Sequence, residues 1–594
     1  MAQDKAMKKQ NVLNGAMILV VATAFVKVIG AIYKIPLTGI IGSLGRGYFA
    51  SAYNIYTPVY AISMAGLPVA VSAIVSKNVA LGRYRDVKQV FKVTFPLFLA
   101  LGIIGTAVLL FLAEPYSASV KSPMSLYSIY CIAPCVLFCC VMSTYRGYYE
   151  GLNNMFPTAI SQVLESLGKL VFGLSLSFVV LDYGTKQIAA TGSVFGIEVK
   201  TEADGAIVYA LAAAAAVFGV TLGTVAGTIY VMLRHRFKKD GITKEMLVNS
   251  PLPQSRKSTV KDIIAIAVPT AISSVVINIT NVIDTIMIQN RLSTVVEKSY
   301  ETIMGIYGDS INAGEIVREN IHTFLYGAYD VTLDFRNLVP TIMMTLGVSA
   351  IPVISSAMAK REFKLVENTV NTVFRMSMLI ALPAGIGFFA LAEPILTVFY
   401  QGSENESGIA VAAPILALYG LMMGIHTLSS PLTNILQAIG RADVPAKALA
   451  IGCGFKIAFN YILIGIPEIN ILGAVFSSGC FYLFCIFYDY AVLKKETGIK
   501  LDWKTVLIKP LISAALCGVA AWGSYELVST YLVFGEAGSR LNSETLACGI
   551  SIIIAVVVYA VCILVSKTIV KDDVLMLPKG EKIAEILEKY KLLG

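Results

Sequence analysis

Long apolar segments recur along the whole 594-residue chain and constrain its fold more than any other feature. Each is long enough to cross a bilayer as a helix of about 20 residues. Only 14% of the residues are charged, against about a quarter in soluble domains, so we predict an all-α polytopic membrane protein. The expected spans number fourteen and lie at 13–33, 48–74, 90–113, 124–145, 157–180, 206–232, 263–289, 324–357, 368–391, 410–436, 446–466, 470–492, 506–530 and 545–566.

The charges between these segments predict the orientation of the chain. Lys and Arg concentrate at the N-terminus, in the connections after even-numbered segments and at the C-terminus, whereas the other connections contain few. Basic loops remain on the cytoplasmic side of a membrane. We therefore expect a multi-pass protein of the cell membrane with both termini in the cytoplasm. Topology also explains the net charge of +9, so no nucleic-acid partner is expected.

The two halves of the chain resemble each other. FLAEP at 111–115 recurs as FALAEP at 389–394, and the residues around Lys169 recur around Lys456, in the same order and at similar separations. The repeat predicts two lobes of six helices, related by a pseudo-two-fold axis along the membrane normal, with a cavity at their interface. The expected divisions are 1–258 for the first lobe and a cytoplasmic linker, 259–500 for the second lobe, and 501–594 for two further helices and an amphipathic cytoplasmic tail.

A polar hairpin connects the segments 124–145 and 157–180. Arg146 and Tyr148 are expected at the level of the lipid head groups, where a guanidinium and a phenol keep their polar tips in water. After the turn, Ser161, Glu165 and Lys169 recur every four residues, which places them on one face of a helix. A polar face inside a bilayer must contact protein or water. We therefore expect this face to be functional.

Four basic side chains lie deep inside apolar segments: Lys27, Lys169, Arg336 and Lys456. Each is roughly 16 to 18 Å from its helix end. A cation at that depth costs a few kcal/mol or more without a partner or a wet cavity. Internal pairing of Lys169 with Glu165, and of Arg336 with acids of its own helix, is one explanation. The other is binding of an anion such as a diphosphate. The polar residues expected around the cavity are Ser161, Gln162, Glu165, Asp330 and Asp334.

Other polar residues in the apolar segments allow more than one interpretation. Asp284 fits a cation or proton site and equally fits hydrogen-bonded packing. His426 has no partner at ligand spacing and is interpreted as a core histidine. The ten cysteines all lie in apolar segments, where they are interpreted as small packing residues rather than a disulfide framework. We expect no metal and no cofactor.

Two stretches resemble a known family. They are GAIYKIPLTGIIGSLGRGYFASAYNIYTPVYAISMAGLPVAVSAIVS at 30–76 and RGYYEGLNNMFPTAISQVLES at 146–166. They resemble the polysaccharide-export and lipid II flippase branch of the multidrug/oligosaccharidyl-lipid/polysaccharide exporter superfamily, closest to the group of stage V sporulation protein B and the Gram-positive cell-wall flippases. The resemblance implies a diphosphate-binding role for Lys27 and Arg336. It also makes Asp284 and Asn460 candidates for ion coupling, and Tyr33 stands where some relatives have an arginine.

The resemblance implies a transporter and not an enzyme. We expect it to flip an undecaprenyl-diphosphate-linked sugar, lipid II or a related polysaccharide unit, to the outer leaflet by alternating access. Its expected partners are membrane lipids and a coupling ion, H⁺ or Na⁺, and we expect a monomer. One alternative is a cation-coupled multidrug exporter of the same superfamily. A second is a membrane enzyme acting on lipid-linked sugars, which requires paired acids or a metal cluster.

Overall fold

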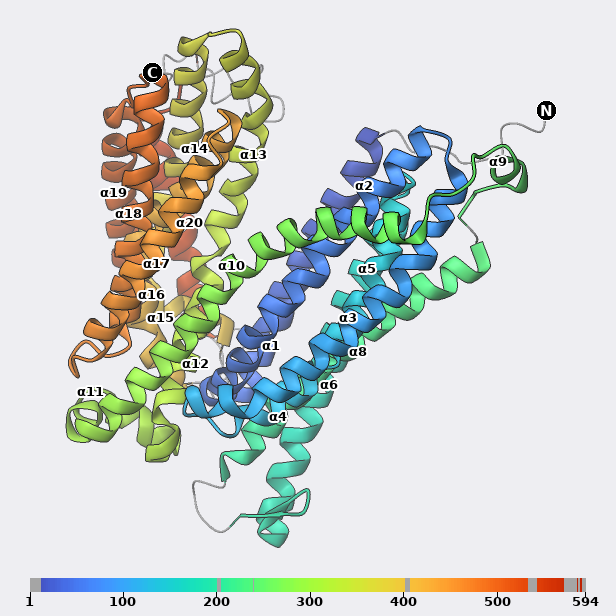
Figure 1. The fold of residues 1–594 in the computed structure, drawn as a ribbon. Coiled ribbons are helices and arrows are strands. Elements are labelled where there is room, and N and C mark those ends of the chain that lie inside the picture. The colour runs from blue at the N-terminus through green and yellow to red at the C-terminus, as the bar shows by residue number, and fades with distance from the viewer. Residues whose placement is uncertain are drawn as a thin grey trace. The chain divides into compact units, whose positions relative to one another are not determined.

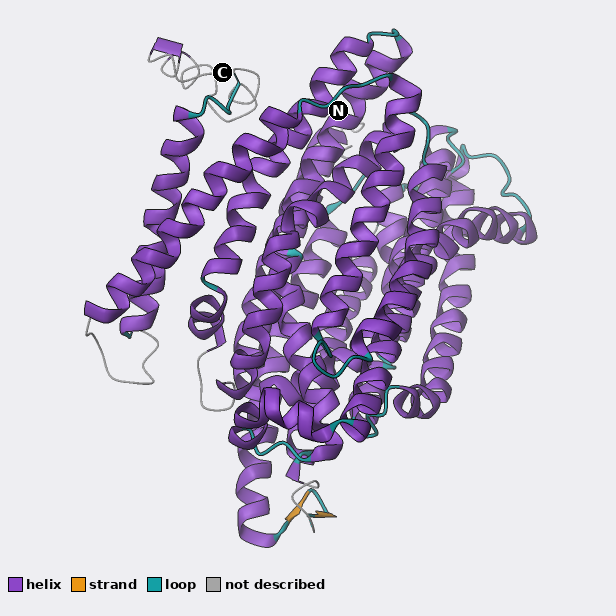
Figure 2. Cartoon of the chain, turned by 90° about the vertical axis from the view of Figure 1, so that its left-hand side faces the viewer, coloured by secondary structure: helices purple, strands orange, loops and turns teal. Residues whose placement is uncertain are grey.

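The structure is a computed structural model that describes residues 12–199, 205–238, 240–400, 406–531 and 542–570, with three positions near the C-terminus. Among these residues the only sheet is a small antiparallel pair, β1 (Ser193–Val194) and β2 (Ile197–Glu198), and nearly all the rest is helical (Figure 2). Twelve described helices are long and apolar enough to cross a membrane. The predicted helical membrane class is therefore confirmed, while the count of fourteen spans stays a prediction. The expected amphipathic tail lies largely outside the described residues.

The helices and the expected spans differ mainly near the N-terminus. Helix α1 (Val12–Ala61) covers the first expected span and part of the second. It is broken at Gly42, where φ is 63° and ψ is −177°, a conformation that only glycine adopts without strain. The second span continues through a π-helical turn (Ile62–Gly66) into α2 (Leu67–Ala80).

The chain forms two compact units, and unit 1 contains Met1–Ser293 and Ile316–Gly327. It therefore extends past the expected boundary at residue 258. Its helices after α1 and α2, coloured from blue to green in Figure 1, are α3 (Tyr84–Ser119), α4 (Ser125–Ile132), α5 (Cys135–Gly151), α6 (Phe156–Thr191), α8 (Ile207–Lys238), α9 (Lys244–Val248) and most of α10 (Arg256–Lys298).

Helices α6 and α8 pack closely because glycines face each other across their contact. A Cβ atom at Gly219 would lie 2.2 Å from the Cα atom of Gly173, and one at Gly168 would lie 2.5 Å from the Cα atom of Gly223. Small residues allow the backbones of membrane helices to approach this closely. This contact places the polar face of α6 beside α8.

The linker after α8 is attached to the start of α3. Arg85 Nε donates to the carbonyl of Leu247 over 2.8 Å, and Lys88 and Tyr148 both donate to Asp240. Burial raises the pKa of Asp240, but the hydrogen bonds from Lys88 and Tyr148 outweigh burial, so the pKa lies below the ordinary value of an aspartate. The linker is thus part of unit 1.

Unit 2 contains Thr294–Glu315 and Ala328–Gly594. A buried apolar cluster extends through it from α13 to α19. Its helices are α11 (Tyr300–Ala313), the end of α12 (Ile321–Arg336, after a 3₁₀ turn at Arg318–Asn320), α13 (Leu338–Ala359), α14 (Phe363–Ala390), α15 (Ala392–Tyr400), α16 (Glu406–Ala438), α17 (Asp443–Ile464), α18 (Leu472–Thr497), a π-helical turn (Lys504–Ile508), α19 (Lys509–Tyr531) and α20 (Ser543–Val565).

Candidate functional site

Unit 1 contains a cavity of about 240 Å³ between α1, α5, α6 and α8. Its wall combines four tyrosine rings with ionisable and amide groups, which is the mixture expected of a site for a charged ligand. The lining residues are Thr23, Val26, Ile29, Gly30, Tyr33, Tyr53, Tyr56 and Tyr60 of α1, Arg146 of α5, Gln162, Glu165, Ser166 and Lys169 of α6, and Val220 of α8.

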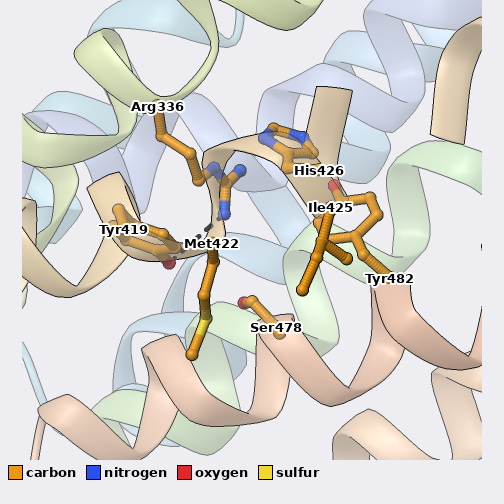
Figure 3. A pocket seen from close by; sticks show the side chains of 8 residues that line it. Arg336, Tyr419, Met422, Ile425, His426, Ser478 and Tyr482 are labelled. Carbon is orange, nitrogen blue, oxygen red and sulfur yellow. Dashed lines mark hydrogen bonds between the residues drawn. The ribbon is translucent and has the colours of Figure 1, made fainter. Parts of the chain in front are cut away.

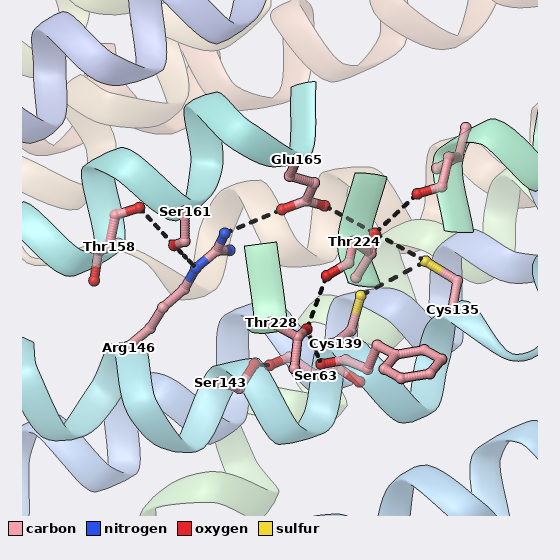
Figure 4. A network of polar contacts seen from close by, with 12 residues as sticks. Ser63, Cys135, Cys139, Ser143, Arg146, Thr158, Ser161, Glu165, Thr224 and Thr228 are labelled. Carbon is pink, nitrogen blue, oxygen red and sulfur yellow. Dashed lines mark hydrogen bonds and ion pairs between the residues drawn. The ribbon is translucent and has the colours of Figure 1, made fainter. Parts of the chain in front are cut away.

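Arg146 forms the centre of a polar network at this cavity (Figure 4). Its Nε donates to Ser161 Oγ over 2.8 Å, and its Nη2 lies 3.0 Å from Glu165 Oε2. Thr224 of α8 donates to the other carboxylate oxygen of Glu165 over 3.5 Å. The expectation that Arg146 and Tyr148 keep their polar tips in water is wrong: they are 1% and 0% exposed, because ion pairing and packing satisfy them inside unit 1. Their depth in the membrane stays a prediction.

Lys169 lies over aromatic rings on the same cavity wall. Its Nζ is 4.7 Å from the ring centroid of Tyr33 and 5.4 Å from that of Tyr53. Tyr33 is fully buried and donates its hydroxyl to the carbonyl of Ala216 of α8, which fixes its ring. Cation–π contacts of this kind stabilise an ammonium without neutralising its charge. Lys169 therefore presents a positive charge at the cavity.

The other predicted site residues of unit 1 differ in whether they line the cavity. Gln162 lines the cavity, and its Oε1 is buried without a hydrogen-bond partner among the described residues. Lys27 is exposed on α1, next to Val26, which lines the cavity, but is not itself part of the lining. Asp284 lies half-buried on α10. Binding roles for Lys27 and Asp284 stay predictions.

Unit 2 holds a second, smaller pocket around Arg336, at the end of α12 (Figure 3). Its volume of about 10 Å³ suits one water-sized group. The guanidinium lies 5.1 Å from the ring centroid of Tyr419, and Nη1 donates to its hydroxyl over 3.3 Å. Within the described part of the chain, Arg336 forms no ion pair, although Asp330 and Asp334 lie on the same helix. The other lining residues are Met422, Ile425, His426, Ser478, Gly479 and Tyr482.

His426 belongs to this pocket, which the interpretation as a simple core histidine missed. Its ring centroid lies 4.3 Å from that of Tyr482, with the ring planes tilted by 43°, and it hydrogen-bonds to the backbone of Arg336. Lys456 also acts on His426 electrostatically, and its Nζ lies 5.9 Å from the ring centroid of Phe481. The pocket therefore has a positive electrostatic environment with neutral hydroxyl donors around it.

Several residues of these sites carry no signal in the sequence. Tyr419 and Ser478 lie on α16 and α18, far from Arg336 along the chain, and no motif marks them. Arg146 was identified in the hairpin but was given an interfacial role. Asn460 is 1% exposed on α17 in unit 2, and its coupling role stays a prediction. Ten free cysteines and no cluster of three or more potential metal ligands occur among the described residues.

Comparison with known proteins identifies the family. A family model described as polysaccharide biosynthesis protein matches residues 12–358, and one described as lipid II flippase MurJ matches residues 338–540. The chain is 26% identical over 526 residues to the lipid II flippase MurJ of Bacillus subtilis (strain 168), covering 86% of this chain and 87% of that protein. It is 23% identical over 573 residues to stage V sporulation protein B of the same organism, covering 96% and 98%.

A solved structure agrees with these matches at the level of the fold. The lipid II flippase MurJ in an inward closed conformation has a TM-score of 0.58 and 14% sequence identity, and the match covers 92% of this chain and 98% of that one. The resemblance of residues 30–76 and 146–166 to the flippase branch is therefore confirmed. Because the first family model spans more than half of the chain, the protein belongs to the polysaccharide biosynthesis protein family.

Proposed function

We propose that the protein is a flippase that moves a lipid-linked saccharide with a diphosphate bridge, lipid II or a related polysaccharide unit, from the cytoplasmic to the outer leaflet. The family membership and the similarity to a lipid II flippase over most of both chains support this proposal. The cell membrane is the proposed location, with both termini in the cytoplasm. The protein works as a monomer, and no bond is made or broken.

The observation that carries the proposal is the environment of Arg336. A guanidinium inside a membrane-spanning unit costs several kcal/mol unless its charge is balanced. Here the neutral hydroxyl of Tyr419 accepts its hydrogen bond, and no carboxylate pairs with it among the described residues. A phosphate oxygen would provide the missing negative charge in a geometry that guanidinium matches well. A cationic drug would meet repulsion at this position.

The proposed mechanism uses positive charge without chemistry on the cargo. Lys169 in unit 1 and Arg336 in unit 2 each present a cation held against tyrosine rings. We propose that these cations, with Lys27 and Lys456, neutralise the diphosphate while the protein alternates between inward-open and outward-open states. The isoprenoid chain remains in lipid throughout. Asp284 and Asn460 are proposed to bind the coupling ion.

The test is flipping of a fluorescent lipid-linked diphosphate saccharide in proteoliposomes containing the purified protein. Arg336→Ala and Lys27→Ala should each abolish flipping, while Arg441→Ala, outside the spans and paired to Asp443 in the turn before α17, should not. Normal flipping by both cation variants would overturn the proposed role of the cations. Conversion of the labelled lipid into a new product by the wild-type protein would instead identify an enzyme.

A further inference from the structure

Asp489 of α18 is an acid inside unit 2 that the proposed mechanism does not use. Its residue is 3% exposed, and its Oδ1 is buried without a hydrogen-bond partner among the described residues. No ion pair to it occurs in that part of the chain either. An ionised carboxylate in such a place would cost several kcal/mol, so burial favours the neutral acid.

The neighbours of Asp489 along α18 are apolar. Cys485 and Leu493, one turn to either side on the same helix face, are 2% and 0% exposed. Leu493 is part of the large apolar cluster of unit 2, and Ile486 and Tyr490 pack against that cluster. Nothing on this face provides the charge or the donors that a carboxylate needs.

Charged groups on α17, which packs against α18, and on α14 have other partners. On α17, Lys447 pairs with Asp443 at 2.9 Å, and Lys456 lies over the ring of Phe481. On α14, Arg375 donates to Thr372 and acts electrostatically on Asp502.

The titratable groups nearest to Asp489 are also weak partners. Cys485 precedes it by one turn on α18, and Cys453 of α17 lies close to Cys485. On α16, His426 contacts Tyr482, which lies seven residues before Asp489 on α18, with a distance of 4.3 Å between the ring centroids. None of them stabilises an ionised Asp489.

We propose that Asp489 is a proton-binding site whose loss of a proton drives a movement of α18. The neutral acid is compatible with the packing described above, whereas the carboxylate must reach water or a cation. Proton release therefore favours a second arrangement of α18, and proton uptake restores the first. As a step coupled to transport, this inference rests on the proposed function, and it adds a proton site to the ion site proposed at Asp284 and Asn460.

Protonation itself is tested by infrared difference spectroscopy of the purified full-length protein, without any cargo. Protein labelled with ¹³C-aspartate should show the C=O band of a neutral aspartic acid near neutral pH, and Asp489→Asn should lack it. Asp489→Glu should shift the band to the unlabelled glutamic acid position, which keeps the test valid if the Asn variant folds poorly. Glu496→Gln, at an exposed carboxylate on the same helix paired with Arg441, should leave the band unchanged. A wild type without such a band, or a band that persists in both Asp489 variants, would overturn the proposal.

Movement of α18 is followed through Trp503, whose ring lies 5.9 Å from that of Tyr490. Because the chain has only two tryptophans, Trp522→Phe leaves Trp503 as a single reporter. Its emission should change with pH between 5 and 9 and become independent of pH when Asp489→Asn is added. Emission that changes equally with and without Asp489 would contradict the coupled movement.

Coupling to transport is tested last, in proteoliposomes with a lipid-linked diphosphate saccharide. While the acid form of Asp489 predominates, the flipping rate of the wild type should rise about tenfold per pH unit, because the ionised fraction of Asp489 rises by that factor. Asp489→Asn should abolish this dependence. If neither protein flips the lipid but the infrared and fluorescence results hold, the proposed cargo is wrong and the proton site stands. Flipping with the same pH dependence in both proteins would overturn the coupling.

Discussion

Arg146 and Glu165 show how one ion pair supports the cavity of unit 1. The side chain of Arg146 is 2% exposed and that of Glu165 is 19% exposed, so the pair lies mostly out of water. Glu165→Leu leaves a buried guanidinium without its counter-charge, which should cost about 3–5 kcal/mol of unfolding free energy. Arg146→Met with Glu165→Leu should recover most of the loss, because no charge remains buried. Thermal unfolding in detergent measures both.

The exposed pair of Asp182 and Lys186, on the same α6 helix, provides the control. These side chains are 47% and 74% exposed, and exposed pairs contribute little to stability. Asp182→Ala should therefore unfold at nearly the wild-type temperature. A Glu165→Leu protein as stable as this control would show that the Arg146 pair contributes nothing to the fold.

Lys169 allows a second prediction at the residue scale. If its ammonium contacts the diphosphate, Lys169→Met should slow flipping at least about tenfold, since a hydrogen bond to a charged group contributes about 1.5–3 kcal/mol. Lys169→Arg should retain part of the rate. Lys186→Met, at an exposed lysine of the same helix, is the matched control. Wild-type flipping by Lys169→Met would assign Lys169 a structural role only.

Sequence reasoning found the ionisable residues of the site but not all of their partners. The four-residue spacing correctly placed Ser161, Glu165 and Lys169 on one side of α6, where they contact or line the cavity network. It could not identify Arg146 as the partner of Glu165, because that contact depends on how α5 crosses α6. Nor did any pattern distinguish Asp489, since only packing reveals that a carboxyl is buried without a donor.

At the scale of elements, the glycines between α6 and α8 allow very close packing in unit 1. A methyl group at Gly219 would lie 2.2 Å from the Cα of Gly173, too close for the backbones to remain in place. Gly219→Ala should therefore lower the unfolding free energy by about 1–3 kcal/mol. Gly454→Ala on α17, where nothing lies within 4 Å of the added atom, should leave stability unchanged or slightly higher. Equal unfolding temperatures of the two variants would contradict the close contact.

The linker attachment predicts a dependence on pH. The pKa of Asp240 is lowered in the folded protein by its hydrogen bonds with Lys88 and Tyr148. These bonds therefore stabilise the attachment fully at a pH above the ordinary aspartate pKa of about 4. The stabilisation is lost as the pH falls through the lowered pKa. A nitroxide at Lys244→Cys on α9 should therefore be immobile at neutral pH and become mobile in acid. Adding Asp240→Asn should make it mobile throughout.

The neighbouring acid Glu245 is the control for this experiment, because it is exposed on α9. Glu245→Gln should leave the nitroxide immobile at neutral pH and mobile in acid, as in the parent. A nitroxide that stays immobile in Asp240→Asn would show that other contacts, such as that of Arg85 with Leu247, suffice to hold the linker.

Elements were predictable from the sequence where local chemistry decides them. The turn at Asn153, with φ of 57°, and the start of α6 at Phe156 with Pro157 in its first turn follow the expected hairpin. The sequence did not predict that α1 would run from the first expected span into the second with a break at Gly42. A single glycine in an apolar segment does not reveal its backbone conformation. The sequence grouped the linker after α8 with the first lobe, but it could not reveal the side-chain contacts with α3 that hold the linker.

At the scale of the whole molecule, the orientation in the membrane follows from charge alone. Basic connections remain cytoplasmic, so the linker with α9 should face the cytoplasm and α11 should face outward. Gly305 on α11 is exposed with nothing within 4 Å of an added Cβ, which makes Gly305→Cys a mild substitution. A membrane-impermeant maleimide should label Gly305→Cys in intact cells, and Lys244→Cys only after permeabilisation.

The native cysteines define the background of this orientation experiment. All ten lie in helices, and a wild-type sample measures their labelling directly. The reverse pattern, with residue 244 labelled in intact cells and residue 305 protected, would invert the protein in the membrane. Inversion would place the linker charges outside, contrary to the proposed cytoplasmic termini. Labelling of both positions in intact cells would mean that an even number of spans separates residues 244 and 305, and would reject the predicted single span at 263–289.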